Sequence, residues 1–210
     1  MPDGSPDIVV AEGAIHFRAG ADAARVAEVV AALQKRPEVG AIFTRPRTDG
    51  AAEGTAAGTL SLDVARWSHS GRSAEILVSP NWTSAKNAAG FEGTTTASGV
   101  AGHGSSSPYD IHNTLIAAGP DFREHVQSSV PTGNVDIAPT LLRLLNLAVP
   151  KTMTGRVIEE GLGTGPAPSS VRVAHSSETV RTADGSYELT AHISTAGGRK
   201  YLDYTEVTRK

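Results

Sequence analysis

Residues 99–122 read Gly-Val-Ala-Gly-His-Gly-Ser-Ser-Ser-Pro-Tyr-Asp-Ile-His-Asn-Thr-Leu-Ile-Ala-Ala-Gly-Pro-Asp-Phe. This is the most informative stretch of the sequence for fold and function. It sets His103 between two glycines in a polar loop, and an apolar run follows that ends at Gly119-Pro120. Imidazole is a common nitrogen ligand for zinc-class metals. Flanking glycines let the backbone bend so that the ring meets a metal or phosphate at close range. The stretch therefore predicts a functional loop with His103 as its candidate ligand.

Taken alone, a Gly-His-Gly turn is more often a loop with a solvated histidine. The residues downstream favour the functional interpretation. After Gly119-Pro120 come Val-Asp-Ile-Ala-Pro-Thr-Leu-Leu at 135–142 and Thr-Gly-Arg-Val at 154–157. With His103-Gly104 and Asp110, this order resembles the C-terminal half of the alkaline phosphatase superfamily, in its type I phosphodiesterase/nucleotide pyrophosphatase and sulfatase-like branch. The resemblance covers about Thr59 to Leu162.

The resemblance implies a partial alkaline-phosphatase-like α/β/α sandwich, with His103 as a ligand of one of two active-site metals. The metal would be a divalent cation, zinc, held only in the complete enzyme, and the substrate a small phosphate or sulfate ester. The nucleophile half of the family pattern is missing, since the sequence contains no Asp-His pair and no cysteine. We therefore expect a C-terminal fragment of a phosphodiesterase, phosphatase or sulfatase-like hydrolase that is inactive by itself. The alternative is a non-catalytic binding or interaction module derived from that fold.

Composition excludes several other classes of protein. Acidic residues (22) slightly outnumber Lys and Arg (19), giving a net charge of −3, so a nucleic acid polymer or an anionic membrane is not the expected partner. Without cysteine, a metal must be held by His, Asp or Glu. No apolar run approaches the roughly 20 residues that span a bilayer. The start, 1–7, is acidic and lacks the pattern of a signal peptide, although relatives of the family are often exported, so localisation stays open.

Hydrophobic periodicity predicts the elements of the N-terminal part. Short apolar runs at 8–11 and 14–17 indicate a hairpin around Glu12-Gly13. A helix is expected over 21–36, because Val26, Val29, Val30 and Leu33 recur at helical spacing and Pro37 ends it. Further strands are expected at 39–44, 58–63, 74–79 and 113–118, with the first and the last two of these mostly buried.

The C-terminal part changes character. A second helix is expected over 134–146, with Asp136 as its N-cap and Ile137, Leu141, Leu144 and Leu145 as its apolar stripe. A short helix follows at 157–161, and then β-rich segments at 171–174, 187–193 and 201–207 predict an antiparallel meander. The expected domains are a C-terminal portion of an α/β domain at 1–162, a linker or surface turn at 163–170, and the meander packed on it at 171–210.

Other residues of the central stretch receive more ordinary interpretations. His112 is expected near the rim of the site rather than on a metal. Asp110 could accept a hydrogen bond from the ring of a ligand histidine, or it could cap a turn. Ser105 to Ser107 have no base at suitable spacing, so we expect polar loop groups rather than a nucleophile. Arg72 and Arg156 could contact phosphate, but surface or fold-stabilising roles are favoured.

The incomplete sandwich has a consequence for association. Half of such a fold leaves apolar surface and a sheet edge uncovered. We therefore expect the isolated chain to form oligomers through an uncovered sheet surface, to aggregate, or to be marginally folded.

Overall fold

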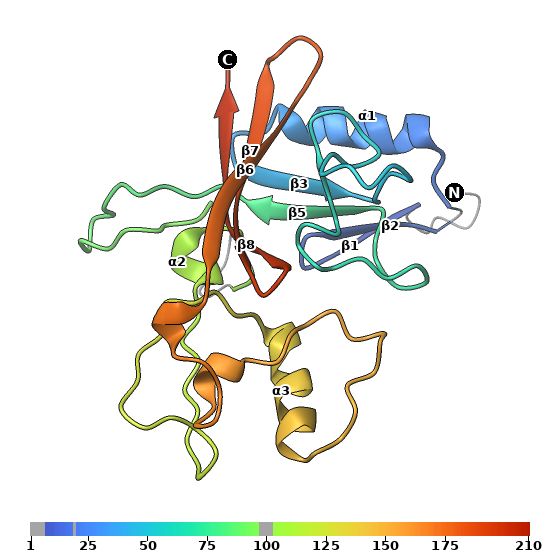
Figure 1. Ribbon diagram of the computed structural model, residues 1–210. Coiled ribbons are helices and arrows are strands. Elements are labelled where there is room, and N and C mark those ends of the chain that lie inside the picture. Colours follow the sequence, from blue (N-terminus) through green and yellow to red (C-terminus); the bar gives the residue numbers. More distant parts are fainter. Residues whose placement is uncertain (1–6, 19, 97–102) are drawn as a thin grey trace. The chain divides into compact units, whose positions relative to one another are not determined.

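The computed structural model describes residues 7–18, 20–96 and 103–210 and shows a mixed α/β protein (Figure 1). Two compact units are present: unit 1 holds the described residues up to 112 with 177–192 and 202–210, and unit 2 holds 113–176 and 193–201. Residues 99–102 of the glycine-rich loop lie outside the described part. Within that part, no helix is both long and apolar enough to cross a membrane.

The main sheet of unit 1 has five strands in the order β1-β2-β5-β3-β4. Its strands are β1 (Ile8–Ala11), β2 (Ala14–Phe17), β3 (Val39–Thr44), β4 (Leu60–Ser61) and β5 (Ile76–Pro80). β3 and β4 are parallel and the other pairs are antiparallel, so the sheet is mixed. All six residues of β3 are buried, as expected for the central apolar run at 39–44. The predicted hairpin is confirmed, with Ala11 paired to Ala14.

The predicted first helix is also confirmed, as α1 (Ala23–Gln34), which packs on β3 (Figure 1). Its N-cap is Asp22, whose carboxylate accepts a hydrogen bond from the Arg25 backbone N–H at 2.8 Å. This bond satisfies one of the donors that the first turn of a helix leaves unpaired. Val26 and Val30 are buried on the side of the helix that the periodicity indicated.

A second, antiparallel sheet contains three strands in the order β6-β7-β8. These strands are β6 (Val173–Arg181), β7 (Tyr187–Ala196) and β8 (Arg199–Arg209), and they confirm the predicted meander with longer strands than expected. In unit 1 the buried Tyr187 donates its hydroxyl to the Gly40 carbonyl at 2.7 Å. The Arg209 guanidinium lies 5.1 Å above the centre of the Tyr187 ring. These contacts join the end of the chain to β3.

Unit 2 is organised around a buried carboxylate, Asp136, at the 3₁₀ turn Asn134–Asp136. The residue stands at the predicted N-cap position of α3 (Ile137–Leu144), but its side chain makes no capping bond to that helix. It accepts hydrogen bonds instead from the backbone N–H groups of Gly133 and Arg156 and from the Tyr201 hydroxyl, at 2.8–2.9 Å. The carboxylate therefore ties three separate segments of unit 2 together.

The close passage of two of these segments explains a glycine in the Thr-Gly-Arg-Val motif. A Cβ atom added to Gly155 would lie 2.0 Å from the Val135 carbonyl oxygen. Any side chain at this position would therefore force the motif away from Asp136. Beyond it lie the 3₁₀ turn Glu159–Gly161, at the predicted short helix, and another, Pro168–Ser170, inside the predicted linker.

The structure corrects the prediction of a buried strand at 113–118. These residues form neither helix nor strand, and all six are exposed, with Ile116 at 85%. An apolar run becomes a strand only when another strand satisfies its backbone groups. No such pairing exists for it among the described residues.

The orientation of the second helix is a further correction. The periodicity placed Ile137, Leu141 and Leu145 toward the core, but all three are exposed. Pro139 and Thr140 are the residues of α3 that are buried. The Thr140 hydroxyl bonds to the Asp136 carbonyl at 2.7 Å and accepts the Ile158 N–H at 3.0 Å, and these two bonds fix which side of the helix faces inward.

Candidate functional site

The candidate site is the segment that carries His103, at the carboxyl end of β5. β5 ends at Pro80, and residues shortly after His103 dock on that strand end. The Ser106 backbone N–H donates to the Ser79 hydroxyl oxygen at 2.9 Å, and the two hydroxyl oxygens are also 2.9 Å apart. Both side chains are buried. The loop is therefore fastened to the sheet three residues after the histidine.

A strand from the end of the chain holds the same residue from another direction. The Ser106 hydroxyl lies 2.6 Å from the Thr205 hydroxyl of β8, and the Thr205 backbone N–H donates to the Ser106 carbonyl at 3.0 Å. We call Ser79, Ser106 and Thr205 the hydroxyl cluster. Its members come from β5, the loop and β8, so it links three segments of unit 1 that are distant in sequence.

Local hydrogen bonds complete the anchorage. The Ser105 backbone N–H donates to the Asp110 carboxylate at 2.5 Å, and the Ser107 hydroxyl accepts the Tyr109 N–H at 3.2 Å as the N-cap of α2 (Pro108–Ile111). Asp110 thus closes the turn, the second of the two roles its position suggested. Ser105 and Ser107 are buried with Ser106, in agreement with the prediction of polar loop groups.

His103 itself is exposed at the open end of this anchored segment. Gly104 follows it with a φ of +79°, in the left-handed region that favours glycine, and a Cβ built there would meet no atom within 4 Å. The backbone thus turns sharply in open space directly after His103. His112, the C-cap of α2, is exposed as well and lies at the far end of the anchored segment.

Within the described residues, no group of three or more His, Asp or Glu side chains could hold a metal ion. A zinc site needs three or four protein ligands. The described residues thus show no complete zinc site of their own.

Two other histidines, His192 and His175, make contacts away from the candidate site. In unit 1, His192 lies 3.1 Å from a Glu206 oxygen and stacks on Tyr204, with ring centres 4.1 Å apart. In unit 2, His175 lies 3.0 Å from the Ser194 hydroxyl. These contacts give both rings partners within the fold.

One contributor to the site was missed in the sequence. Trp82 donates its indole N–H to the Thr205 carbonyl at 2.8 Å, and its ring meets the edges of Tyr109 and Tyr204 at about 6 Å. It therefore packs beside the hydroxyl cluster and α2. The sequence around Trp82 contains no pattern that predicts this packing, because its partners lie far along the chain.

Arg156 is occupied within the fold of unit 2 and does not face a ligand. Its guanidinium forms a two-pronged ion pair with Glu160 at 2.6 and 2.8 Å, and Nε donates to the Tyr201 hydroxyl at 3.0 Å. The side chains of Arg156 and Glu160 are only 10% and 2% exposed. The favoured fold-stabilising role is therefore confirmed, whereas Arg72 is exposed.

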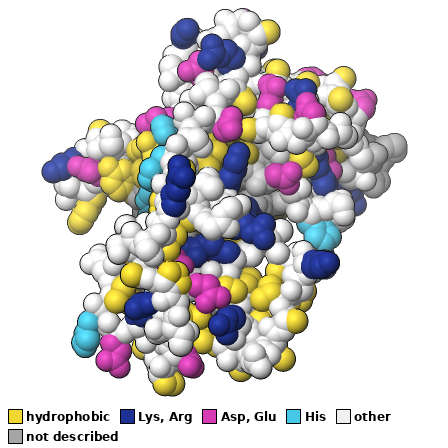
Figure 2. Space-filling model, in the orientation of Figure 1, with side chains coloured by type: hydrophobic (Ala, Val, Ile, Leu, Met, Phe, Trp, Pro, Cys, Tyr) yellow, Lys and Arg dark blue, Asp and Glu magenta, His cyan; other side chains and the backbone are white. Residues whose placement is uncertain are grey.

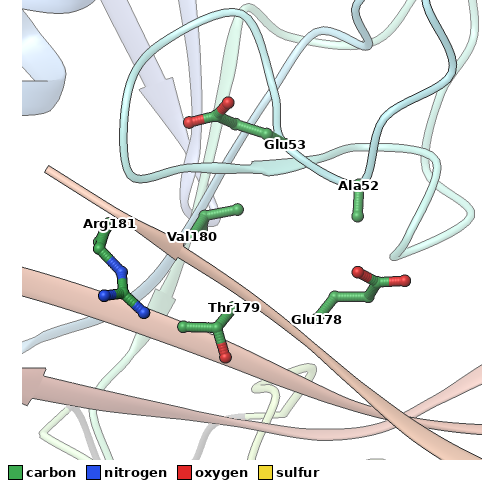
Figure 3. Close-up of a pocket in the computed structure, with 6 residues that line it drawn as sticks. All are labelled: Ala52, Glu53, Glu178, Thr179, Val180 and Arg181. Carbon is green, nitrogen blue, oxygen red and sulfur yellow. The ribbon is translucent and has the colours of Figure 1, made fainter.

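A shallow hollow of about 290 Å³ lies elsewhere in unit 1 (Figure 3). It is lined by residues of the 52–53 turn and of β6: Ala52, Glu53, Glu178, Thr179, Val180 and Arg181. Its charged groups already have partners, since Glu53 pairs with Arg47 at 3.0 Å and Arg181 with Glu188 at 3.4 Å. No residue of the anchored segment lines it, so this hollow is not part of the candidate site.

Comparison with known proteins gives no match to a family model, a curated protein or a solved structure.

Proposed function

We propose that this chain is the C-terminal portion of a metal-dependent hydrolase of phosphoric or sulfuric esters with an alkaline-phosphatase-like sandwich, and that it supplies His103 as one metal ligand. The observation that carries the proposal is the contrast between His103 and the residues that follow it. His103 is exposed, whereas Ser105, Ser106 and Ser107 are buried and hydrogen-bonded. A solvated histidine in a loose turn would need no such anchorage.

The anchorage supports a role in ligation for a physical reason. Metal ligands work best when surrounding hydrogen bonds fix their position before the metal binds. The hydroxyl cluster and Asp110 hold the backbone two and three residues beyond His103, and Gly104 provides the turn. In this proposal the anchored backbone on one side of His103 limits where the imidazole can lie, and its exposed ring can meet a metal.

The contacts of the serines beside His103 support a structural role for these residues rather than a catalytic one. A bound zinc-class metal supplies charge stabilisation and an activated oxygen nucleophile. The serine hydroxyls beside His103 already have partners: Ser106 in the hydroxyl cluster, Ser107 at the Tyr109 N–H and Ser105 at the Ser107 N–H. In this proposal they hold the loop, and the attacking group and remaining ligands come from another polypeptide segment.

The experiment compares the chain alone with the chain produced together with the polypeptide encoded directly upstream. Zinc content is measured by mass spectrometry, and turnover with aryl phosphate and aryl sulfate esters. The chain alone is expected to show neither stoichiometric zinc nor turnover. The extended form is expected to show both, and His103→Ala should lower its rate by orders of magnitude.

His112→Ala is the matched control, because this histidine is also exposed but follows the anchored segment. It should change the rate far less than His103→Ala. Robust turnover by the chain alone would overturn the proposal, since it would require a nucleophile and ligands within these residues. An inactive extended form that binds no zinc would favour the non-catalytic interaction module.

A further inference from the structure

A second segment of unit 1, the loop at residues 81–96 that follows β5, packs against α2, the helix beside the turn that follows His103. The Tyr109 hydroxyl of α2 donates a hydrogen bond to the Glu92 carboxylate at 2.9 Å. A Cβ atom added to Gly93 would lie 2.5–2.9 Å from three carbon atoms of the Tyr109 side chain. The backbone at Gly93 therefore lies directly against that side chain, and only glycine leaves room for it.

Loop 81–96 has hydrogen bonds of its own that keep it closed. The Thr83 N–H donates to the Thr94 carbonyl at 3.1 Å. At the tip, the Asn87 side-chain oxygen accepts two backbone N–H groups at 3.0 Å. Residues 83–92 are exposed, and Figure 2 shows this part of the chain standing out from the surface. The loop is thus a hydrogen-bonded hairpin with a defined shape, which can fix the groups that lie against it.

Tyr109 connects this hairpin to the candidate ligand. It precedes Asp110, whose carboxylate accepts the Ser105 N–H. α2 contains only four residues, so both side chains belong to one helical turn, and a displacement of Tyr109 displaces Asp110 with it. The Trp82 ring lies edge-on to Tyr109, with ring centres 6.0 Å apart, and adds a second contact from the start of the same loop. The turn that follows His103 is therefore coupled to the loop through Tyr109.

We propose that loop 81–96 holds α2 in place, and that Glu92 and Gly93 are positioning residues for His103 that act through Tyr109. Asp110 fixes the turn relative to α2, and the loop fixes α2 relative to β5, because the loop continues directly from that strand. The expected effect on metal binding rests on the proposed function, whereas the effect on the turn does not.

Two glycines of the loop supply a matched pair of substitutions. Gly93 and Gly90 have φ values of +79° and +86°, so alanine meets similar backbone strain at both. Only at Gly93 would the new methyl group collide with Tyr109, since a Cβ atom at Gly90 would meet nothing within 4 Å. Gly93→Ala should therefore accelerate hydrogen exchange at the Ser105 amide of the chain alone about fivefold or more, while Gly90→Ala should leave it nearly unchanged. Amides of α1 should exchange alike in both variants, which separates a local effect from a loss of global stability.

Glu92 provides an independent test that adds no backbone strain. Glu92→Ala removes the acceptor of the Tyr109 hydroxyl and should accelerate Ser105 exchange about threefold. Glu92→Gln keeps an acceptor oxygen and should restore most of the protection. Equal Ser105 exchange in Gly93→Ala and Gly90→Ala, or in Glu92→Ala and wild type, would overturn the proposal.

Zinc binding by the extended form tests whether the positioning reaches His103. Gly93→Ala should weaken zinc affinity about tenfold relative to Gly90→Ala, since groups that support metal ligands have effects of this size. If both variants bind zinc equally well although their Ser105 exchange differs, Gly93 is not a positioning residue for His103. An extended wild type that binds no zinc would refute the proposed function instead, and the exchange measurements would still decide whether the loop holds α2.

Discussion

The hydroxyl groups of Ser106 and Thr205 lie 2.6 Å apart although 99 residues separate them in the sequence. The contact connects the segment after His103 to a strand at the end of the chain. Both groups are buried, and Ser79 supplies the third member of the cluster. The position of the candidate ligand loop therefore depends on the C-terminal strand, which the sequence gives no reason to associate with it.

Thr205→Val tests the energetic weight of this contact. The substitution keeps the shape of the side chain but removes the hydroxyl, which leaves Ser106 with one buried partner fewer. A loss of about 1–3 kcal/mol in the free energy of unfolding is expected. Urea denaturation measures it, and Thr208→Val, at an exposed position of the same strand, is the control. Equal stability of the two variants would contradict a structural role for the cluster.

The buried ion pair of unit 2 should be sensitive to the loss of either partner. Glu160→Gln leaves the Arg156 guanidinium buried without its counter-charge, and a loss of about 3–5 kcal/mol is expected. The double substitution Arg156→Met with Glu160→Leu should cost less than the sum of the single ones, because neither charge is then left unpaired. Strictly additive losses would show that the pair is not coupled in this way.

The same pair predicts how stability changes in acid. Burial by itself would raise the pKa of Glu160, but the hydrogen bonds from Arg156 outweigh it and hold that pKa below its ordinary 4.5. The pair therefore contributes stability above about pH 4.5, and this contribution is lost as the pH falls through the lower pKa of the folded state. From pH 6 to pH 3, wild type should lose more stability than Glu160→Gln. If wild type and Glu160→Gln lose the same stability between pH 6 and pH 3, the ion pair makes no such contribution.

In alkaline solution, Tyr201 should make the stability of the fold decrease as the pH rises. Burial, followed by its hydrogen bond to Asp136, raises its pKa from 10.0 to about 12. The folded state thus retains a proton that the unfolded chain gives up above pH 10, so stability falls as the pH rises from 10 to 12. Tyr201→Phe should be less stable at pH 8, because Asp136 and Arg156 each lose a partner, but its stability should fall less steeply between pH 9 and 11.

Local signals in the sequence were sufficient for the elements that bury one regular face. α1 and β3 were predicted from the spacing of Val26 and Val30 and from the unbroken apolar run at 39–44, because their core lies beside them in unit 1. The same signals found the helix α3 but not the side that it buries, and they failed at 113–118. Apolar periodicity indicates which residues can be buried, but it does not show whether another element of the fold packs against them.

The candidate site was predictable only in part. His103 and its glycines were recognisable from the sequence, whereas the residues that hold the loop were not. Ser79, Ser106 and Thr205 are ordinary polar residues whose meeting depends on tertiary structure. Trp82 and the Tyr201–Asp136 contact were hidden for the same reason, since long-range hydrogen bonds leave no periodic pattern.

Asp110 is expected to act as a positioning residue for His103. Its carboxylate accepts the N–H of Ser105, two residues beyond the histidine. Asp110→Ala removes this acceptor and should loosen the turn, so hydrogen exchange at the Ser105 amide of the chain alone should accelerate about tenfold or more, because the amide loses its partner. Asp110→Asn retains an acceptor oxygen and should restore most of the protection.

If the proposed function holds, the same substitution should weaken zinc binding by the extended form about 10- to 100-fold, since supporting groups of metal ligands have effects of this size. His112→Ala should leave zinc affinity nearly unchanged, because His112 lies beyond the anchored turn. Faster exchange in Asp110→Ala without any change in zinc affinity would separate the two claims. Asp110 would then stabilise the turn, but His103 would not depend on that turn as a ligand.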